Sequence, residues 1–144
     1  MENIKLYELK KIQTEFPQVL IRESNESYGF IKQFYGDDID IYESFFILLL
    51  NRANQTIGYA KISQGGITGT YVDIKIIAKY AVESLASAVI LAHNHPSGNT
   101  TPSQADKNST ETIKKGLKIL DIEVLDHIIL TSDSYYSFAD NFIL

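Results

Sequence analysis

The sequence contains no cysteine and no tryptophan, and it has only three prolines among 144 residues. Without cysteine there is no disulfide framework, no thiolate ligand for a metal ion and no cysteine nucleophile. The longest apolar run, FFILLL, suits a buried strand and is far too short to span a membrane. The N-terminal segment MENIKLYELKK lacks the basic-then-apolar order of a signal peptide. We therefore expect a cytoplasmic protein with no membrane association.

Positive charge is also scarce, because 13 lysines and arginines stand against 18 aspartates and glutamates, giving a net charge of -5. Nonspecific binding to nucleic acid comes largely from basic side chains that neutralise phosphates. The composition thus does not favour a broad nucleic-acid surface, although it is compatible with a local basic patch. A hydrophobic content of 44% and a charged content of 22% are ordinary for a globular chain, and the length suits one domain.

Apolar patterning predicts an α/β fold. Strands are expected at 42–51 and 56–63, joined as a hairpin by RANQ, and at 87–93, where SAVILAH has the continuous apolar character of a strand covered on both faces. The segments IEVLDHIILT and YYSF are expected to close the chain as a strand pair around SDS. Helices are expected after Asp73 and from Ser103 to Leu120. A mixed sheet with helices packed against it, in a three-layer sandwich, is the arrangement that these elements favour.

Three finer expectations concern the first forty residues, a glycine-rich segment and the helix after Asp73. The first forty residues are patterned more weakly, so we expect a short extension over 1–40 and a main domain over 41–144; the extension contains a helix in SNESYGFIKQF with Ser24 as its cap. The glycine-rich QGGITGT is expected to be a bulge or loop, because it lacks the lysine of a phosphate-binding loop. The helix after Asp73 is expected to bury one stripe, formed by Ile74, Ile77, Ala78, Ala81, Val82 and Leu85.

The chemistry is concentrated in LAHNHPSGNTTPSQAD, residues 91–106. On a strand, His93 and His95 project to the same face while Asn94 faces away. Ser103 is a plausible helix N-cap, and Asp106 follows it at the spacing of a capping box.

Asp106 also falls on the apolar stripe of its helix, and an ionised carboxylate that points inward is costly unless it is paired or binds a metal ion. Two imidazoles and one carboxylate leave the fourth position of a tetrahedral zinc site open, as catalytic zinc sites do. The alternative is that the two histidines lie in a surface loop without function and that Ser103 and Asp106 only cap the helix. The stripe is expected to contain Thr110, Ile113, Leu117 and Leu120.

The pattern H-x-H-x(7)-S-x-x-D with an upstream glutamate resembles the JAMM metalloprotease signature. The longer string LAHNHPSGNTTPSQAD, followed by LDHIILT and YYSF, resembles the bacterial RadC family over about residues 40 to 140. The resemblance implies an α/β/α sandwich of the MPN type, related to the cytidine deaminase architecture. It implies that His93, His95 and Asp106 bind Zn²⁺, that Ser103 helps to hold the developing oxyanion, and that Glu43 holds and deprotonates the zinc-bound water.

These roles imply a zinc-dependent hydrolase that acts on a peptide or isopeptide amide of a peptide or protein substrate. One alternative is an accessory protein of DNA repair or of a mobile element, with a structural or vestigial zinc site; another is a metal-dependent nuclease. For Glu43 alone, the alternative is a solvated acid at a strand edge. Full-length RadC proteins carry an N-terminal helix-hairpin-helix region, and residues 1–40 are too short to supply it, so the expectation is a short form. His127 is expected to be a structural histidine beside Asp126, in preference to a catalytic one.

Overall fold

A computed structural model describes residues 1–8, 10–65 and 72–144. Most of the predicted glycine-rich bulge, QGGITGT, lies outside the described residues. Among the helices of the described part, none is long and apolar enough to cross a membrane. The elements are α1 (Ser24–Lys32), η1 (Asp37–Asp40), β1 (Ser44–Leu50), β2 (Thr56–Gln64), α2 (Ile74–Glu83), β3 (Ala88–Asn94), α3 (Gln104–Ile119), β4 (Glu123–Leu130) and β5 (Tyr135–Ser137).

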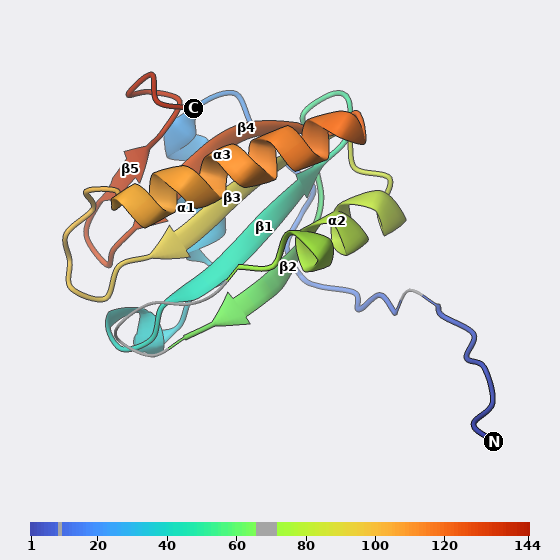
Figure 1. The fold of residues 1–144 in the computed structure, drawn as a ribbon. Helices are drawn as coiled ribbons and strands as arrows, with labels where there is room; N and C mark the ends of the chain where they lie inside the picture. Colours follow the sequence, from blue (N-terminus) through green and yellow to red (C-terminus); the bar gives the residue numbers. More distant parts are fainter. Residues whose placement is uncertain (9, 66–71) are drawn as a thin grey trace.

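The five strands form one mixed sheet in the order β2-β1-β3-β4-β5. Strand β1 is antiparallel to both β2 and β3, and β4 is antiparallel to β5. Strands β3 and β4 are parallel, and α3 makes the crossover between them (Figure 1). The hairpin, the buried central strand and the closing strand pair predicted from the sequence are therefore confirmed.

Helices cover both faces of the sheet, which confirms the three-layer sandwich (Figure 1). On one face, α2 and α3 bury their apolar stripes against alternate residues of the strands; on the other, α1 and η1 do so. Central strand β3 is buried along its whole length because it has a helical layer on each side. Odd-numbered β3 residues such as Val89 and Leu91 face α2 and α3, whereas Ile90 and Ala92 face the α1 layer.

Residues 21–40 contribute to this core through Ile21, Ile31 and Ile39. Val19 and Phe16 also pack on the body, whereas residues 1–8 run away from it in an extended path (Figure 1). The predicted cap at Ser24 is wrong. The N-cap residue is Glu23, and Ser24 is already helical, with its hydroxyl taken up by Tyr135 and Asp140 of the C-terminal segment.

Helix α2 begins as predicted, with the Asp73 carboxylate accepting a hydrogen bond from the Lys75 amide at 2.8 Å. Its predicted stripe is correct for Ile77 and Ala81 but wrong at its end, because Val82 is 47% exposed and Leu85 is 84% exposed. The helix stops at Glu83, and Leu85 lies in the following turn with a φ of 56°. Leu120, at the end of α3, is exposed for the same reason, since the helix ends one residue earlier.

Candidate metal centre

Strand β3 ends at the edge of the sheet that faces the start of α3. His93 lies near this end of the strand, and His95 follows its last residue. His93 follows Val89 and Leu91 on the α2–α3 face, and its ring lies parallel to that of Phe45 on the neighbouring strand. His95 lies one residue past the strand, but its amide still bonds the Leu130 carbonyl of β4 at 3.0 Å, which keeps the chain extended. The two Nε2 atoms consequently converge to 3.0 Å, as the sequence predicts.

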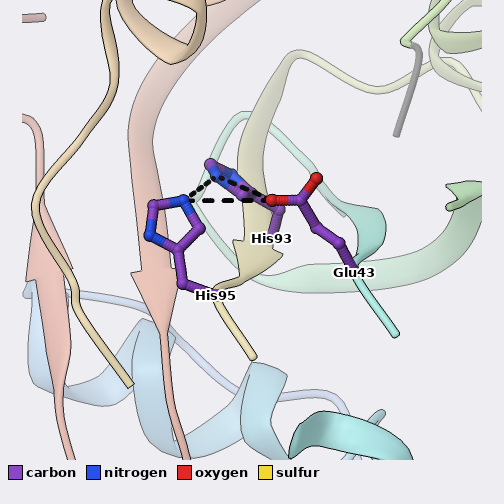
Figure 2. A group of neighbouring side chains, drawn as sticks. All are labelled: Glu43, His93 and His95. Carbon is purple, nitrogen blue, oxygen red and sulfur yellow. Dashed lines mark hydrogen bonds and ion pairs between the residues drawn. The ribbon is translucent and has the colours of Figure 1, made fainter. Parts of the chain in front are cut away.

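Two carboxylates flank this pair of nitrogens. Asp106 places Oδ1 at 3.3 Å from Nε2 of His93 and Oδ2 at 3.3 Å from Nε2 of His95. Glu43, from the segment before β1, places Oε1 at 4.0 Å and 3.9 Å from the same two atoms (Figure 2). Glu43, His93 and His95 offer ligand atoms that all lie within 4.8 Å of one another, so they form a possible metal-binding group. A cavity of about 70 Å³ lies beside this group and is lined in part by Glu43, His93 and Asp106.

The first turn of α3 holds Asp106. The Ser103 hydroxyl accepts a hydrogen bond from the Asp106 amide at 3.0 Å, and the Asp106 carboxylate accepts one from the Ser103 amide at 2.8 Å, so the predicted capping box is present. Burial alone would raise the pKa of Asp106, but the imidazoles of His93 and His95, each 3.3 Å away, outweigh it and hold that pKa well below its usual range. Asp106 is therefore ionised across the physiological pH range.

The loop after β3 orients the second imidazole. Nδ1 of His95 donates a hydrogen bond of 2.7 Å to the carbonyl of Asn99, so the lone pair of the neutral ring lies on Nε2 and points into the site. The chain turns tightly between His95 and Asn99, and a hydrogen bond from the Gly98 amide to the His95 carbonyl closes this turn. Gly98 has a φ of 85°, which glycine adopts without strain. Partial burial lowers the pKa of His95, but the bonds to Asp106 and Asn99 and the nearby carboxylates produce a net rise.

On the opposite face of β3, Asn94 fixes the backbone around Glu43. It is fully buried, and its Oδ1 accepts a hydrogen bond from the Ser44 amide at 2.7 Å. Its amide group donates to the carbonyls of Tyr42 and Ile39 at 2.8 Å and 2.7 Å. Because Asn94 binds the residues on both sides of Glu43, it determines where that side chain starts. Strand alternation predicts that Asn94 lies on the far face, but it does not predict these bonds to the backbone around Glu43. The only signal in the sequence is an asparagine between two candidate ligands.

His127 is the third histidine of the cluster. It is 1% exposed, and its Nε2 lies 2.7 Å from Nδ1 of His93, while its Nδ1 lies 2.6 Å from the Thr110 hydroxyl. Burial lowers the pKa of His127 far below its usual value. The neighbouring Asp126 carboxylate accepts hydrogen bonds from the Ser137 hydroxyl and from the backbone amides of His127 and Ala139.

The sequence-predicted residues thus divide into two groups. Glu43, His93, His95 and Asp106 lie together, and Glu43, His93 and Asp106 line one cavity. Ser103 lies next to them at the N-cap of α3, where it is exposed and its oxygen is engaged by the Asp106 amide. In the described part of the chain, neither Glu43 nor Asp106 forms an ion pair with a lysine or arginine. Two carboxylates and two imidazole nitrogens that lie together, with no lysine or arginine paired to these carboxylates in the described residues, form a donor set suited to a cation.

Comparison with known proteins agrees with this geometry. The family model described as "RadC-like JAB domain" matches residues 21–143. A UPF0758 protein of Flavobacterium johnsoniae is 50% identical over 99 residues, which are 69% of this chain and 43% of that protein. A UPF0758 protein of Porphyromonas gingivalis is 39% identical over 125 residues, or 86% of this chain and 54% of the relative. The UPF0758 protein YfjY of Escherichia coli is 46% identical over 102 residues, 71% of this chain and 64% of the relative. The match therefore covers about half of the length of these curated relatives.

Proposed function

Because this chain belongs to the RadC-like JAB domain family, we propose that it is a zinc-dependent hydrolase, with His93, His95 and Asp106 as the metal ligands and a peptide or isopeptide amide as the substrate. The observation that carries the proposal is the convergence of the two Nε2 atoms and two carboxylates at the end of the sheet. This donor set contains no thiolate and only hard or borderline ligands, which suits Zn²⁺.

The distances support different roles for the two carboxylates. In a tetrahedral site with bonds of about 2.0–2.1 Å, neighbouring ligand atoms lie about 3.3–3.4 Å apart. The Asp106 carboxylate lies at this edge length from both imidazole nitrogens, with Oδ1 at 3.3 Å from His93 and Oδ2 at 3.3 Å from His95. The Glu43 oxygen, at 3.9 Å and 4.0 Å from the same nitrogens, lies farther than the edge. We assign Asp106 as the third ligand and Glu43 as the group beside the open fourth position.

Zinc, when bound, acidifies water and polarises the carbonyl of an amide. In this assignment Oε1 of Glu43 accepts the proton of the attacking water and returns it to the nitrogen of the leaving amine. We assign to Ser103 the donation of its hydroxyl hydrogen to the oxygen that becomes negative; its oxygen accepts from the Asp106 amide, which leaves that hydrogen available. His95 and Asp106 are the groups that must lose their shared proton before a metal ion binds.

The decisive experiment loads the purified chain with zinc and screens peptide and isopeptide amides against wild type and Glu43→Gln. We expect zinc at one ion per chain in both proteins, cleavage of at least one amide by wild type, and loss of that cleavage in Glu43→Gln. His95→Ala is the control that should lose the zinc itself. Wild type without measurable zinc affinity would overturn the proposal.

The same preparation addresses the two alternatives. DNA binding that falls with salt and survives both Glu43→Ala and His93→Ala would indicate an accessory protein in which the metal site takes no part in binding. Metal-dependent nicking of plasmid DNA that disappears in Asp106→Ala would indicate a nuclease.

A further inference from the structure

A chain of hydrogen bonds runs from the backbone of α3 through Thr110 and His127 to His93. We infer that Thr110 and His127 are positioning residues, which fix the tautomer of His93 that directs the lone pair of Nε2 into the site. The inference rests on the proposed function for the purpose of that lone pair, whereas the hydrogen-bond pattern itself is independent of it.

The direction of each bond follows from the number of hydrogens available. The Thr110 hydroxyl lies 2.7 Å from the Asp106 carbonyl, which has no hydrogen to give, so the hydroxyl must donate there. Because the one hydroxyl hydrogen is donated to that carbonyl, the Thr110 oxygen can only accept a hydrogen bond from Nδ1 of His127, at 2.6 Å. A neutral His127 with its hydrogen on Nδ1 has a lone pair on Nε2, so it accepts from Nδ1 of His93 at 2.7 Å. His93 then carries its lone pair on Nε2.

The surroundings of His127 explain why it stays neutral. Its ring stacks on Phe138, with centroids 4.6 Å apart, and meets the edge of Phe45 at 5.5 Å. No carboxylate of the described residues forms an ion pair with it, so burial in this apolar setting disfavours the charged ring. An apolar side chain would fill such a place equally well, so packing alone does not explain why a histidine stands here.

The backbone also departs from regular pairing to bring His127 to this face. In the β3–β4 register, Val89 pairs with Val124 but Ile90 pairs with Asp126, so β4 contains one extra residue there. Without that irregularity, strict alternation from Val124 would turn His127 toward the α1 layer, away from His93. The bulge places it opposite Leu91, on the face that α3 covers.

This chain of hydrogen bonds, the Thr110–His127–His93 relay, also connects the two elements α3 and β3, which supply candidate ligands. Its first acceptor is the carbonyl of Asp106 itself, on α3, and its last donor is His93, on β3. The same hydrogen bonds that select the tautomer thus hold the His93 ring in a fixed orientation relative to Asp106. Partners of this kind behind a ligating histidine typically change metal affinity by about 10–100-fold when they are removed.

Two substitutions at Thr110 separate this role from packing. Thr110→Val keeps the shape but removes the hydroxyl, so His127 is free to move its hydrogen to Nε2 and force the opposite tautomer on His93. Thr110→Ser keeps the hydroxyl and loses only a methyl group. We expect zinc affinity, measured by competition with a chelator, to fall about 10–100-fold in Thr110→Val and to stay near wild type in Thr110→Ser. Packing alone predicts the reverse order.

A second pair acts on the imidazole. His127→Gln can present an acceptor oxygen to Nδ1 of His93, whereas His127→Phe cannot, so zinc affinity should be largely retained in the first and lost by about 10–100-fold in the second. Thermal unfolding of each variant shows whether it is folded before its metal affinity is compared.

Nitrogen-15 spectra of the histidine rings test the tautomers in the metal-free protein, at a pH above the histidine titrations. We expect hydrogen on Nδ1 of both His93 and His127 in wild type and in Thr110→Ser, and a changed His127 tautomer in Thr110→Val. Hydrogen on Nε2 of His93 in wild type, or equal zinc affinity in Thr110→Val and wild type, would overturn the inference. If zinc binds as expected but no amide is cleaved, the hydrolase proposal fails while this inference stands. If no zinc binds, the spectra alone decide it.

Discussion

The two carboxylates of the site are held in different ways. The Asp106 carboxylate accepts a hydrogen bond from the Ser103 amide and lies 3.3 Å from the Nε2 atom of each imidazole, on the first turn of a sixteen-residue helix. Glu43 is held through the backbone on either side of it, by Asn94, and its carboxylate stays at 3.9 Å or more from both nitrogens. A ligand benefits from a fixed oxygen, whereas a group that carries a proton needs room to move between two positions. The difference in anchoring therefore agrees with the difference in proposed role.

The largest effect should come from exchanging each carboxylate for its amide. Glu43→Gln removes proton transfer, which is typically worth about 10²–10⁴-fold in rate, while zinc stays bound. Asp106→Asn removes a charged ligand, so both zinc and activity should be lost. Zinc content by elemental analysis and hydrolysis of the amide found in the screen check both variants. Loss of zinc in Glu43→Gln would mean that Glu43 is itself a ligand and would reverse the two roles.

Ser103→Ala should have an intermediate effect, because the residue has two functions at one atom. Loss of an oxyanion donor typically costs about 10²–10³-fold in rate, and loss of a helix N-cap about 1 kcal/mol in stability. Ser103→Gly retains much of the cap preference but has no hydroxyl, so it should recover stability and not activity. Equal activity of Ser103→Ala and wild type would limit Ser103 to capping.

Asn94→Ala should affect Glu43 without touching the ligands. It leaves the buried Ser44 amide and the Tyr42 and Ile39 carbonyls unpaired, each at a cost of about 1–3 kcal/mol in the free energy of unfolding. Since these groups flank Glu43, we expect the rate of hydrolysis to fall in protein that is still folded and still binds zinc. Urea unfolding, zinc content and activity measure the three effects.

A matched control for Asn94 lies at the other end of β1. Asn51 accepts hydrogen bonds from the amides of Ala53 and Gln55 in the β1–β2 turn. Asn51→Ala should lower stability while leaving the rate of hydrolysis unchanged. A similar loss of rate in both variants would mean that destabilisation, and not the position of Glu43, explains the effect at Asn94.

The sequence sufficed for the sheet, its two helical layers and the convergence of His93 and His95, because these follow from apolar periodicity and from alternation along one strand. It also predicted the capping box of Ser103 and Asp106, which depends on a spacing of three residues. These features are local, and the side chains concerned are determined by the element on which they lie.

What the sequence could not supply depends on register and on contacts between distant segments. Alternation gives no sign of the bulge between Val124 and Asp126, so the face on which His127 lies was not predictable. The clamp of Asn94 joins residues 50 positions apart, and the relay from Thr110 to His127 crosses 17. The exposure of Val82 and Leu85 depends on where α2 stops, which its apolar pattern does not define.

The smallest effect concerns protons in the metal-free site. Partial burial lowers the pKa of His95, but the hydrogen bonds to Asp106 and Asn99 raise it above the usual 6.5. Burial raises the pKa of Asp106, but the two neighbouring imidazoles hold it below the usual 3.8. The raised pKa of His95 adds stability below about pH 6.5 that is lost as the pH rises, and the lowered pKa of Asp106 adds stability above about pH 3.8 that is lost as the pH falls. The pair therefore stabilises the metal-free fold between these limits.

Zinc must displace the proton on His95, so zinc affinity should increase through the pKa of His95, by about tenfold per pH unit below it. In metal-free Asp106→Asn, the His95 titration followed by NMR should move to lower pH because the neighbouring charge is gone. Glu43→Gln should move it less, since Asp106 both bonds and attracts the ring at 3.3 Å while Glu43 only attracts it from 3.9 Å. A larger shift in Glu43→Gln than in Asp106→Asn would contradict the assignment of Asp106 as the more tightly held carboxylate.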